Sequence, residues 1–187
     1  MLVTLARCAA VPVMVALLWT TPDPAMGRIC MAVFVAAMIG DVIDGWLARK
    51  WDIQSVAGAF LDPIADKLLV LATLVMLIPL GWVPAWMVLV LEARELIIGA
   101  VRQIAISEGL VISAGSMGKF KTAYQSTSLG FLLWHYDTTL SIGGYTLQAN
   151  AHTVGIVLLF QSMVMSVASA IEYGWGFYKH HTARRSA

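Results

Sequence analysis

Six apolar stretches, each near or above the length of a membrane span, most restrict what this chain can fold into. A helix needs about 20 apolar residues to cross a hydrocarbon core of about 30 Å. The chain has 187 residues, of which 59% are hydrophobic and 12% charged, and its mean hydropathy is +0.79. Because the connections are short, the pattern predicts a single all-α integral membrane domain over residues 1–187, with six transmembrane helices at Leu2–Trp19, Arg28–Arg49, Phe60–Leu80, Val83–Ile106, Gly118–Tyr136 and Ala151–Phe177.

The basic residues predict how these helices are oriented. The first, third and fifth connections are poor in lysine and arginine, whereas the second carries Arg49 and Lys50 and the fourth leads into Lys119 and Lys121. Positive residues favour the cytoplasmic side of a membrane. We therefore expect both termini on the cytoplasmic side of a bacterial-type inner (cell) membrane. The first apolar stretch is expected to remain in the protein, because no small-residue cleavage site for a signal peptidase follows it.

One charged stretch, GDVIDGWLARKWDIQSVAGAFLDPIADK, interrupts the apolar pattern. Asp41 and Asp44 are three residues apart at the end of the second predicted helix, so they share a helical face. Asp62 and Asp66 are four residues apart at the start of the third, where the proline fits the first turn. A short connection makes the two helices antiparallel neighbours, and their carboxylate faces are predicted to meet at the cytoplasmic end.

Four carboxylates at this depth are costly unless something neutralises them. Arg49, Lys50 and Lys67 lie nearby but do not easily pair with all four acids, whereas a divalent cation would. Oxygen ligands suit Mg²⁺, Mn²⁺ or Ca²⁺ rather than zinc. A structural salt-bridge cluster is the alternative that spacing alone leaves open. The two cysteines are expected to be buried thiols, and the net charge of +1 gives no indication of a nucleic-acid partner.

The charged stretch can be written as D-x2-D-G-x2-A-R-x8-G-x3-D-x3-D, running from Asp41 to Asp66. It resembles the signature of the CDP-alcohol phosphotransferase family at every defined position. The segments EARELIIGAVRQ and GKFKTAYQ are similar to segments of the phosphatidylglycerophosphate synthase branch of that family. The resemblance covers most of the chain and includes the count of six helices.

The resemblance implies an enzyme in which an alcohol attacks the β-phosphorus of a CDP-linked lipid and CMP is released. It implies a divalent metal cofactor, namely two ions of Mg²⁺ or Mn²⁺, held by Asp41, Asp44, Asp62 and Asp66. Asp66 would also be the catalytic base for the acceptor hydroxyl. The resemblance further implies a homodimer, and it assigns the CDP-lipid to Asp41, Gly45, Ala48, Arg49, Ser55 and Gly58.

A second group of cations suggests which alcohol is used. Arg94 and Arg102 are eight residues apart, about two helical turns, and so lie near one face. With Lys119 and Lys121 they are predicted to bind the phosphate of an anionic acceptor. The segment resemblance favours glycerol 3-phosphate, giving phosphatidylglycerophosphate and CMP from CDP-diacylglycerol. Inositol phosphate, or phosphatidylglycerol as in cardiolipin synthesis, are alternative acceptors.

A divalent-cation transporter is the alternative from another class. It is disfavoured because the acids gather at one face rather than at the midplane. The sequence also departs from the family at one point. Relatives usually begin with an amphipathic stretch containing an Asn-x-Pro-like element ahead of Thr-x-x-Arg. Here Thr4 and Arg7 match the second part alone. Either the sequence starts late or this member lacks that interfacial helix, and the sequence leaves open any acceptor or lipid contact made by the first part.

Overall fold

The computed structural model describes residues 2–51, 56–107, 117–142 and 145–185, with side chains for 6–40, 64–107, 120–137 and 150–177. Six helices and one β-hairpin make up this described part. The helices are α1 (Leu2–Leu17), α2 (Pro24–Trp51), α3 (Val56–Leu77), α4 (Ala85–Ser107), α5 (Met117–Trp134) and α6 (Ala151–Arg185). The hairpin strands are β1 (Thr138–Ile142) and β2 (Tyr145–Ala149). The predicted number of helices is therefore confirmed.

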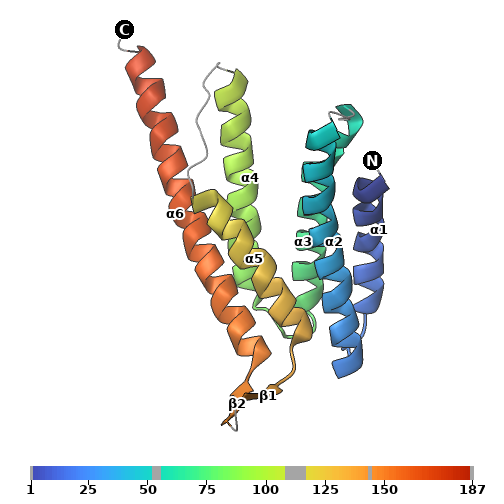
Figure 1. The fold of residues 1–187 in the computed structure, drawn as a ribbon. Coiled ribbons are helices and arrows are strands. Elements are labelled where there is room, and N and C mark those ends of the chain that lie inside the picture. Colours follow the sequence, from blue (N-terminus) through green and yellow to red (C-terminus); the bar gives the residue numbers. More distant parts are fainter. Residues whose placement is uncertain (1, 52–55, 108–116, 143–144, 186–187) are drawn as a thin grey trace.

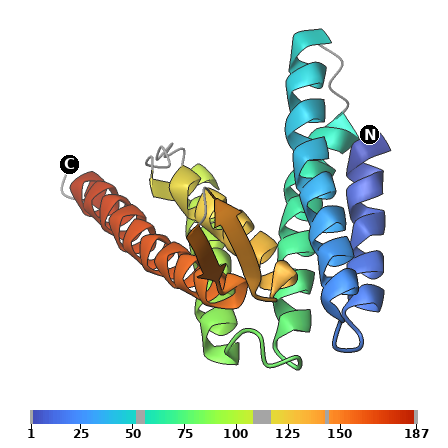
Figure 2. The ribbon, with the colours of Figure 1, turned by 60° about the horizontal axis from the view of Figure 1, so that its bottom comes forward.

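The helices form two groups of three. Helix α1 packs against α2 and α3, while α6 packs against α4 and α5, and α2 meets α5 between the groups. Figures 1 and 2 show this division from two directions. The start of α1, the end of α2, the start of α3 and the ends of α4 and α6 lie at one end of the bundle, hereafter the motif end (Figure 1). The hairpin lies at the opposite end, so the connections alternate between the two ends as the sequence predicts.

Two helices begin where an N-cap residue fixes them. Helix α2 begins at Pro24, about one turn before the predicted start, because the Asp23 carboxylate accepts a hydrogen bond from the backbone N–H of Met26 at 2.7 Å. Proline suits this first helical position because its missing N–H would have no partner there. Asn150 caps α6 in the same way, accepting from the N–H of Thr153 at 2.7 Å. Side-chain capping of this kind stabilises a helix start by about 1 kcal/mol.

The structure corrects the prediction for Pro63. Helix α3 begins at Val56 rather than Phe60, so Pro63 stands about two turns inside the helix and not in its first turn. Helix α6 is also longer than predicted and continues past Phe177 to Arg185. Both differences extend a helix at the motif end, beyond the apolar run from which its length was predicted.

Glycine and histidine terminate two helices at the other end. After α3, Trp82 donates its N–H to the carbonyl of Leu77 at 3.1 Å and Gly81 donates to Ile78 at 2.9 Å. This pair of bonds is a Schellman motif, which requires the left-handed backbone that Gly81 adopts at φ 72°. After α5, His135 takes the left-handed position at φ 56° instead of a glycine.

His135 is held in that conformation by aromatic contacts. Its ring stacks on Trp82 with centroids 3.7 Å apart, and it meets the His152 ring edge-on at 4.8 Å. His152 Nε2 in turn donates to the Trp82 carbonyl at 2.9 Å. Trp82 is buried, whereas Trp19 and Trp86 are exposed. Trp82 joins the loop after α3 to the end of α5 through its ring and to the start of α6 through its carbonyl.

The hairpin was not predicted. The sequence analysis treats the segment between the last two helices as a plain connection, but β1 and β2 pair antiparallel there, with Thr138 opposite Ala149 and Ile142 opposite Tyr145. Threonine, isoleucine and tyrosine favour strands, and two glycines separate the strands in the sequence. The prediction of an all-α chain thus holds for the bundle and is corrected for this segment.

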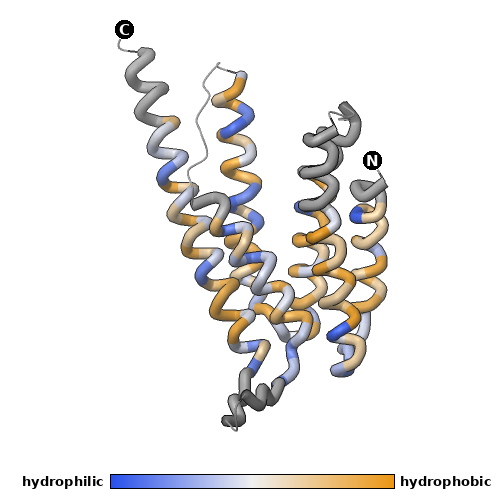
Figure 3. The backbone as a smooth tube through the Cα atoms, viewed as in Figure 1, coloured by the Kyte–Doolittle hydropathy of each residue, from blue (hydrophilic) through white to orange (hydrophobic). Residues whose placement is uncertain are grey.

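The outer surface of the bundle is apolar. On α6, an exposed stripe at helical spacing consists of Val154, Val157, Phe160, Val164, Val167 and Ile171. Figure 3 shows that orange, apolar residues recur along several helices. Among the described residues, the stretch Ala151–Phe177 alone is both long and apolar enough to cross a membrane, with a hydropathy of 2.1. Helix α4 fails that test because Glu92, Arg94, Glu95 and Arg102 lie along it.

Candidate functional site

The predicted metal and nucleotide residues lie on α2 and α3 at the motif end. Asp41, Asp44, Gly45, Ala48 and Arg49 stand in the last part of α2, and Gly58 and Asp62 in the first part of α3. Their backbones are helical as predicted, but their side chains lie outside the described residues, and so does Ser55 altogether. The meeting of the four carboxylates therefore stays a prediction from the sequence pattern.

Asp66 is the motif aspartate whose side chain is described. It is half-buried on α3, one turn after Asp62, and the next residue is the exposed Lys67. Among the described side chains, no group of three or more His, Cys, Asp or Glu residues comes close enough to hold a metal ion. The described side chains do not include those of Asp41, Asp44 and Asp62, three of the four predicted ligands. The donor set of four carboxylates at i, i+3 and i, i+4 spacing is of the kind that Mg²⁺ or Mn²⁺ accepts.

Arg94 and Lys121, two of the four predicted acceptor residues, are brought together. Both long side chains turn toward the carboxylate of Glu95: Arg94 donates to Glu95 Oε1 at 2.7 Å, and Lys121 donates to the same oxygen. Lys67 of α3 lies 3.7 Å from Glu95 Oε2. Three cations from three helices thus surround one acid, and we refer to Lys67, Arg94, Glu95 and Lys121 as the cation cluster.

The members of the cation cluster differ in how far their side chains are buried. The side chains of Lys121 and Arg94 are 8% and 12% exposed, whereas Glu95 is 27% and Lys67 66% exposed. Buried charges need partners, because removing an ion from water costs several kcal/mol. The pairs made by Arg94 and Lys121 are therefore the energetically important ones, and the exposed Lys67 pair contributes at most about 1 kcal/mol.

A serine face on α6 supports this cluster from behind. Ser162, Ser166 and Ser169 are spaced by four and three residues and so share one side of the helix. Arg94 donates from Nε to the carbonyl of Ser166 at 2.9 Å and from a terminal nitrogen to Ser169 Oγ at 3.1 Å. Ser162 Oγ donates to the carbonyl of Lys121 at 3.1 Å. Helix α6 thus fixes the arginine of α4 and the backbone of α5 together.

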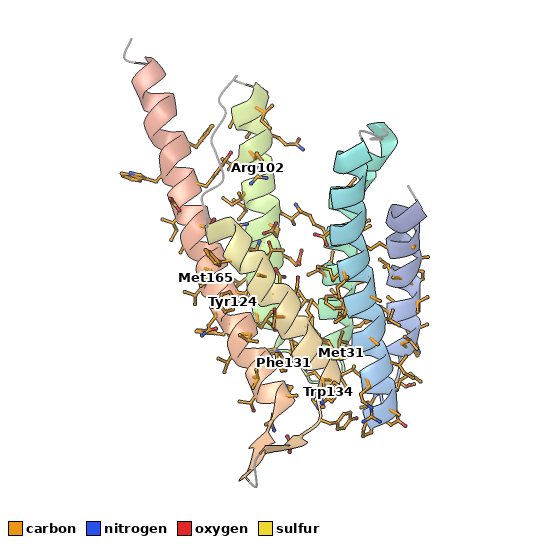
Figure 4. All side chains as sticks on the ribbon, viewed as in Figure 1. Met31, Arg102, Tyr124, Phe131, Trp134 and Met165 are labelled. Carbon is orange, nitrogen blue, oxygen red and sulfur yellow. The ribbon has the colours of Figure 1, made fainter. Side chains whose placement is uncertain are left out.

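The other two predicted acceptor residues are not in the cluster. Arg102 is exposed, and its guanidinium carbon lies 5.9 Å from the ring centroid of Tyr173 on α6. Figure 4 shows Arg102 toward the end of α4 that belongs to the motif end. The side chain of Lys119 lies outside the described residues. Sequence reasoning named Arg94 and Lys121 correctly as neighbours but placed neither Glu95 at their centre nor the serines behind them.

Charged residues lie on both sides of the interface between the two helix groups. Helices α2 and α3 carry the motif aspartates, and α4 and α5 carry the buried cations Arg94 and Lys121. Lys67, which directly follows Asp66, connects the two sets through Glu95. Such an arrangement favours chemistry at phosphorus, in which charge neutralisation and positioning do most of the work.

Comparison with known proteins agrees with this class. The family model for CDP-alcohol phosphatidyltransferases matches residues 1–172. The chain belongs to this family.

Several curated relatives are similar over most of the chain. It is 38% identical to the CDP-diacylglycerol–glycerol-3-phosphate 3-phosphatidyltransferase 2 of Arabidopsis thaliana, covering 91% of this chain and 75% of the relative. It is 35% identical to the Bacillus subtilis enzyme of the same activity name, over 71% of this chain and 75% of the relative. It is also 34% identical to a rice cardiolipin synthase (CMP-forming), over 91% of this chain and 54% of the relative.

Proposed function

We propose that this chain transfers the phosphatidyl group of CDP-diacylglycerol to glycerol 3-phosphate, giving phosphatidylglycerophosphate and CMP. The observation that carries the proposal is the buried pair of cations, Arg94 and Lys121, which Glu95 and Lys67 link to the motif-bearing helix α3. An acceptor that itself carries a phosphate makes use of them, whereas a cationic alcohol such as choline does not. Relatives from a plant and a bacterium carry this activity in their names.

The reaction requires one bond to form and one to break. The acceptor hydroxyl oxygen attacks the β-phosphorus, the phosphorus that bears the diacylglycerol. The bond from this phosphorus to the oxygen bridging it to the α-phosphorus breaks, and that oxygen leaves with CMP. The hydroxyl proton passes to the carboxylate of Asp66, which acts as general base. Half-burial of Asp66 suits this role, because part of the residue stays accessible while part is shielded from water.

The motif residues divide the work of binding CDP-diacylglycerol. Asp41, Asp44, Asp62 and Asp66 hold two Mg²⁺ or Mn²⁺ ions, which supply positive charge to the pyrophosphate when bound. The small residues Gly45, Ala48 and Gly58 leave the helix backbones open to the nucleotide. Arg49 and Ser55 contact its phosphates and the remaining polar groups.

The metal ions make a separate prediction. We expect chelation by EDTA to stop turnover and added Mg²⁺ or Mn²⁺ to restore it.

The membrane setting follows from the same substrate. Six spanning helices keep the diacylglycerol in lipid, and the motif end faces the cytoplasm, where CMP and glycerol 3-phosphate are soluble. The apolar stripe on α6 supports contact with lipid. The enzyme acts as a homodimer in a bacterial-type inner membrane. The family match favours this enzyme over the divalent-cation transporter considered from the sequence.

A second acceptor is favoured by one observation. The rice relative named as a cardiolipin synthase matches nearly the whole chain, which supports phosphatidylglycerol as the alternative alcohol. Phosphatidylglycerol carries a phosphodiester with one negative charge, so it would use the same cations less fully than a phosphomonoester. Inositol phosphate carries a phosphomonoester and remains the third acceptor to compare.

The test is CMP release by the purified protein with CDP-diacylglycerol and Mg²⁺ or Mn²⁺. Separate reactions receive glycerol 3-phosphate, inositol 1-phosphate, phosphatidylglycerol or free glycerol. Selective release with glycerol 3-phosphate supports the proposal, and free glycerol is the matched control that lacks the phosphate. Equal rates with glycerol and glycerol 3-phosphate would contradict the assignment of the cations to an acceptor phosphate.

A further inference from the structure

Glu95 lies where three helices meet, and this position points to a role that the motif does not assign. It belongs to α4, its Oε1 accepts from Lys121 of α5, and its Oε2 faces Lys67 of α3 at 3.7 Å. Arg94, its neighbour in the chain, donates to it at 2.7 Å. Among the described residues, the Lys67–Glu95 pair is the ion pair that joins the motif-bearing helix group to the α4–α6 group.

Arg94 and Lys121 depend on Glu95 to different degrees. Arg94 is also held by two bonds to the serine face of α6, at 2.9 and 3.1 Å, so it stays in place without the acid. Lys121 has a flexible four-carbon stem, and Glu95 is the one hydrogen-bond acceptor that its ammonium reaches within the described residues. Without that carboxylate, an ammonium that is 8% exposed would face Arg94 and move away from it.

Among the described residues, Arg94 and Lys121 each keep N–H donors that are not bonded to Glu95. An ammonium has three N–H groups and a guanidinium five. Lys121 uses one of them on Glu95, and Arg94 uses three, on Glu95 and the serine face. Within the described residues, two N–H groups on each have no bond of this kind and can meet another anion. Since both cations converge on the same Glu95 oxygen, these remaining donors start from neighbouring points, as recognition of one phosphate requires.

We propose that Glu95 is a positioning residue of the acceptor site: it acts through Lys121, holding that ammonium beside Arg94 so that the two bind one phosphomonoester. The proposal rests on the proposed function, because it takes the acceptor to be glycerol 3-phosphate. Glu95 does not touch the reacting atoms. Its contact with Lys67, the residue that follows Asp66 on α3, places the cation pair next to the motif-bearing helix.

The test compares Glu95→Gln with Glu172→Gln in steady-state CMP release. Glutamine keeps the shape of Glu95 and removes its charge, and Glu172 is an exposed glutamate on α6 that serves as the matched control. Losing a charge-assisted hydrogen bond corresponds to roughly a tenfold change or more. We expect the KM for glycerol 3-phosphate to rise roughly tenfold in Glu95→Gln, with the KM for CDP-diacylglycerol within about twofold of wild type. Glu172→Gln should leave both constants unchanged.

Inorganic phosphate and Glu95→Asp separate positioning from a general structural role. Inorganic phosphate should compete with glycerol 3-phosphate in the wild type, and its inhibition constant should rise in Glu95→Gln in parallel with the KM. Glu95→Asp keeps the charge on a shorter arm, and its KM should fall between those of wild type and Glu95→Gln. If Glu95→Gln does not purify as a folded protein, Glu95→Asp alone carries the comparison.

Two results would overturn the inference. One is a wild-type KM for glycerol 3-phosphate in Glu95→Gln, or in Glu95→Asp where that variant carries the comparison. The other is an equal rise in both KM values, which would show a loss of structure and not of the acceptor site. Failure of the proposed function is a different observation, because the wild-type protein itself would then release no CMP with glycerol 3-phosphate.

Discussion

Gly155 of α6 lies in close contact with α5, and replacing it should separate the two helices. A Cβ at this position would lie 2.7 Å from Leu132 Cγ and 3.0 Å from both Leu132 Cδ2 and the Leu132 backbone nitrogen. The Gly155 carbonyl also accepts a hydrogen bond from Ser128 Oγ at 2.7 Å. Because one of the crowded atoms belongs to the backbone, a change of rotamer does not relieve the clash, and the helices themselves must shift.

The size of the effect follows from two opposing terms. Forcing an extra methyl group into a packed interface costs about 1–3 kcal/mol. Alanine gains about 0.8–1 kcal/mol over glycine in a helix interior. With a contact as short as 2.7 Å, the upper part of the first range applies, so Gly155→Ala should lose about 1–2 kcal/mol. Gly174 lies on the same helix with nothing within 4 Å of its Cβ position, so Gly174→Ala should gain up to about 1 kcal/mol.

The measurement is thermal unfolding of both variants in one detergent, followed by circular dichroism. For a chain of this length, 1 kcal/mol corresponds to about 2–4 °C, so the two alanine variants should differ on the order of 5–10 °C. Gly174→Ala controls for the general effect of alanine on α6. A Gly155→Ala protein as stable as Gly174→Ala would refute the claim that α5 and α6 are in contact at this glycine.

Three further predictions follow from single residues. Arg94→Lys should raise the KM for glycerol 3-phosphate roughly tenfold in the CMP-release assay, because an ammonium does not reproduce the forked bonds to α6 and Glu95; an unchanged KM would contradict the role of that fork. Burial lowers the pKa of His135 from its ordinary 6.5, and the charge of His152 lowers it further while Asp137 opposes this. The folded state then binds a proton less readily than the unfolded state, so stability is full above pH 6.5 and falls as the pH decreases through that value. The Tm of His135→Asn should fall less than that of the wild type between about pH 7.5 and 5.5, and equal slopes would argue against His135 as the source. Asp66→Asn should abolish CMP release while the protein still elutes and unfolds like the wild type, and wild-type turnover would exclude Asp66 as the base.

The helices were predictable because their lengths follow from apolar runs, but several of their ends were not. The start of α6 at Ala151 was predicted. Asp23 begins α2 about one turn before the predicted Arg28 through a side-chain bond to a backbone N–H group, which a hydropathy pattern does not register. This capping residue is visible in the sequence and could have been used. The early start of α3, which places Pro63 inside the helix, has no such signal in its residues, and the sequence offers no reason for it.

The glycines show why packing is harder to predict than helix position. In the sequence, Gly130, Gly155, Gly174 and Gly176 look alike, since each lies in an apolar helix and could allow a close helix contact. Gly155 does so, but the Cβ positions of the other three have nothing within 4 Å. Small residues permit close approach without requiring it. Which glycine is used depends on how α5 crosses α6, and that crossing is set by both helices together.

The candidate site also has a part that could be predicted from the sequence and a part that could not. Spacing placed the aspartates on shared faces because i, i+3 and i, i+4 relations are local, and local relations can be read from one helix. The cation cluster joins residues from α3, α4 and α5, so its centre depends on tertiary packing. Glu95 stands beside Arg94 in the sequence, yet nothing local indicates that its carboxylate reaches Lys121, which is 26 residues away.

This division suggests how the two tasks of the enzyme are separated in the fold. In the proposed function, α2 and α3 carry the acids assigned to the CDP-linked substrate, while α4 and α5, fixed from behind by the serine face of α6, carry the groups assigned to the acceptor. The ion pair between Lys67 and Glu95 is exposed on the lysine side and therefore weak. A weak connection lets the acceptor half change its residues without disturbing the acids. Proteins that share the aspartate motif but use different alcohols should then differ first around Arg94, Glu95 and Lys121.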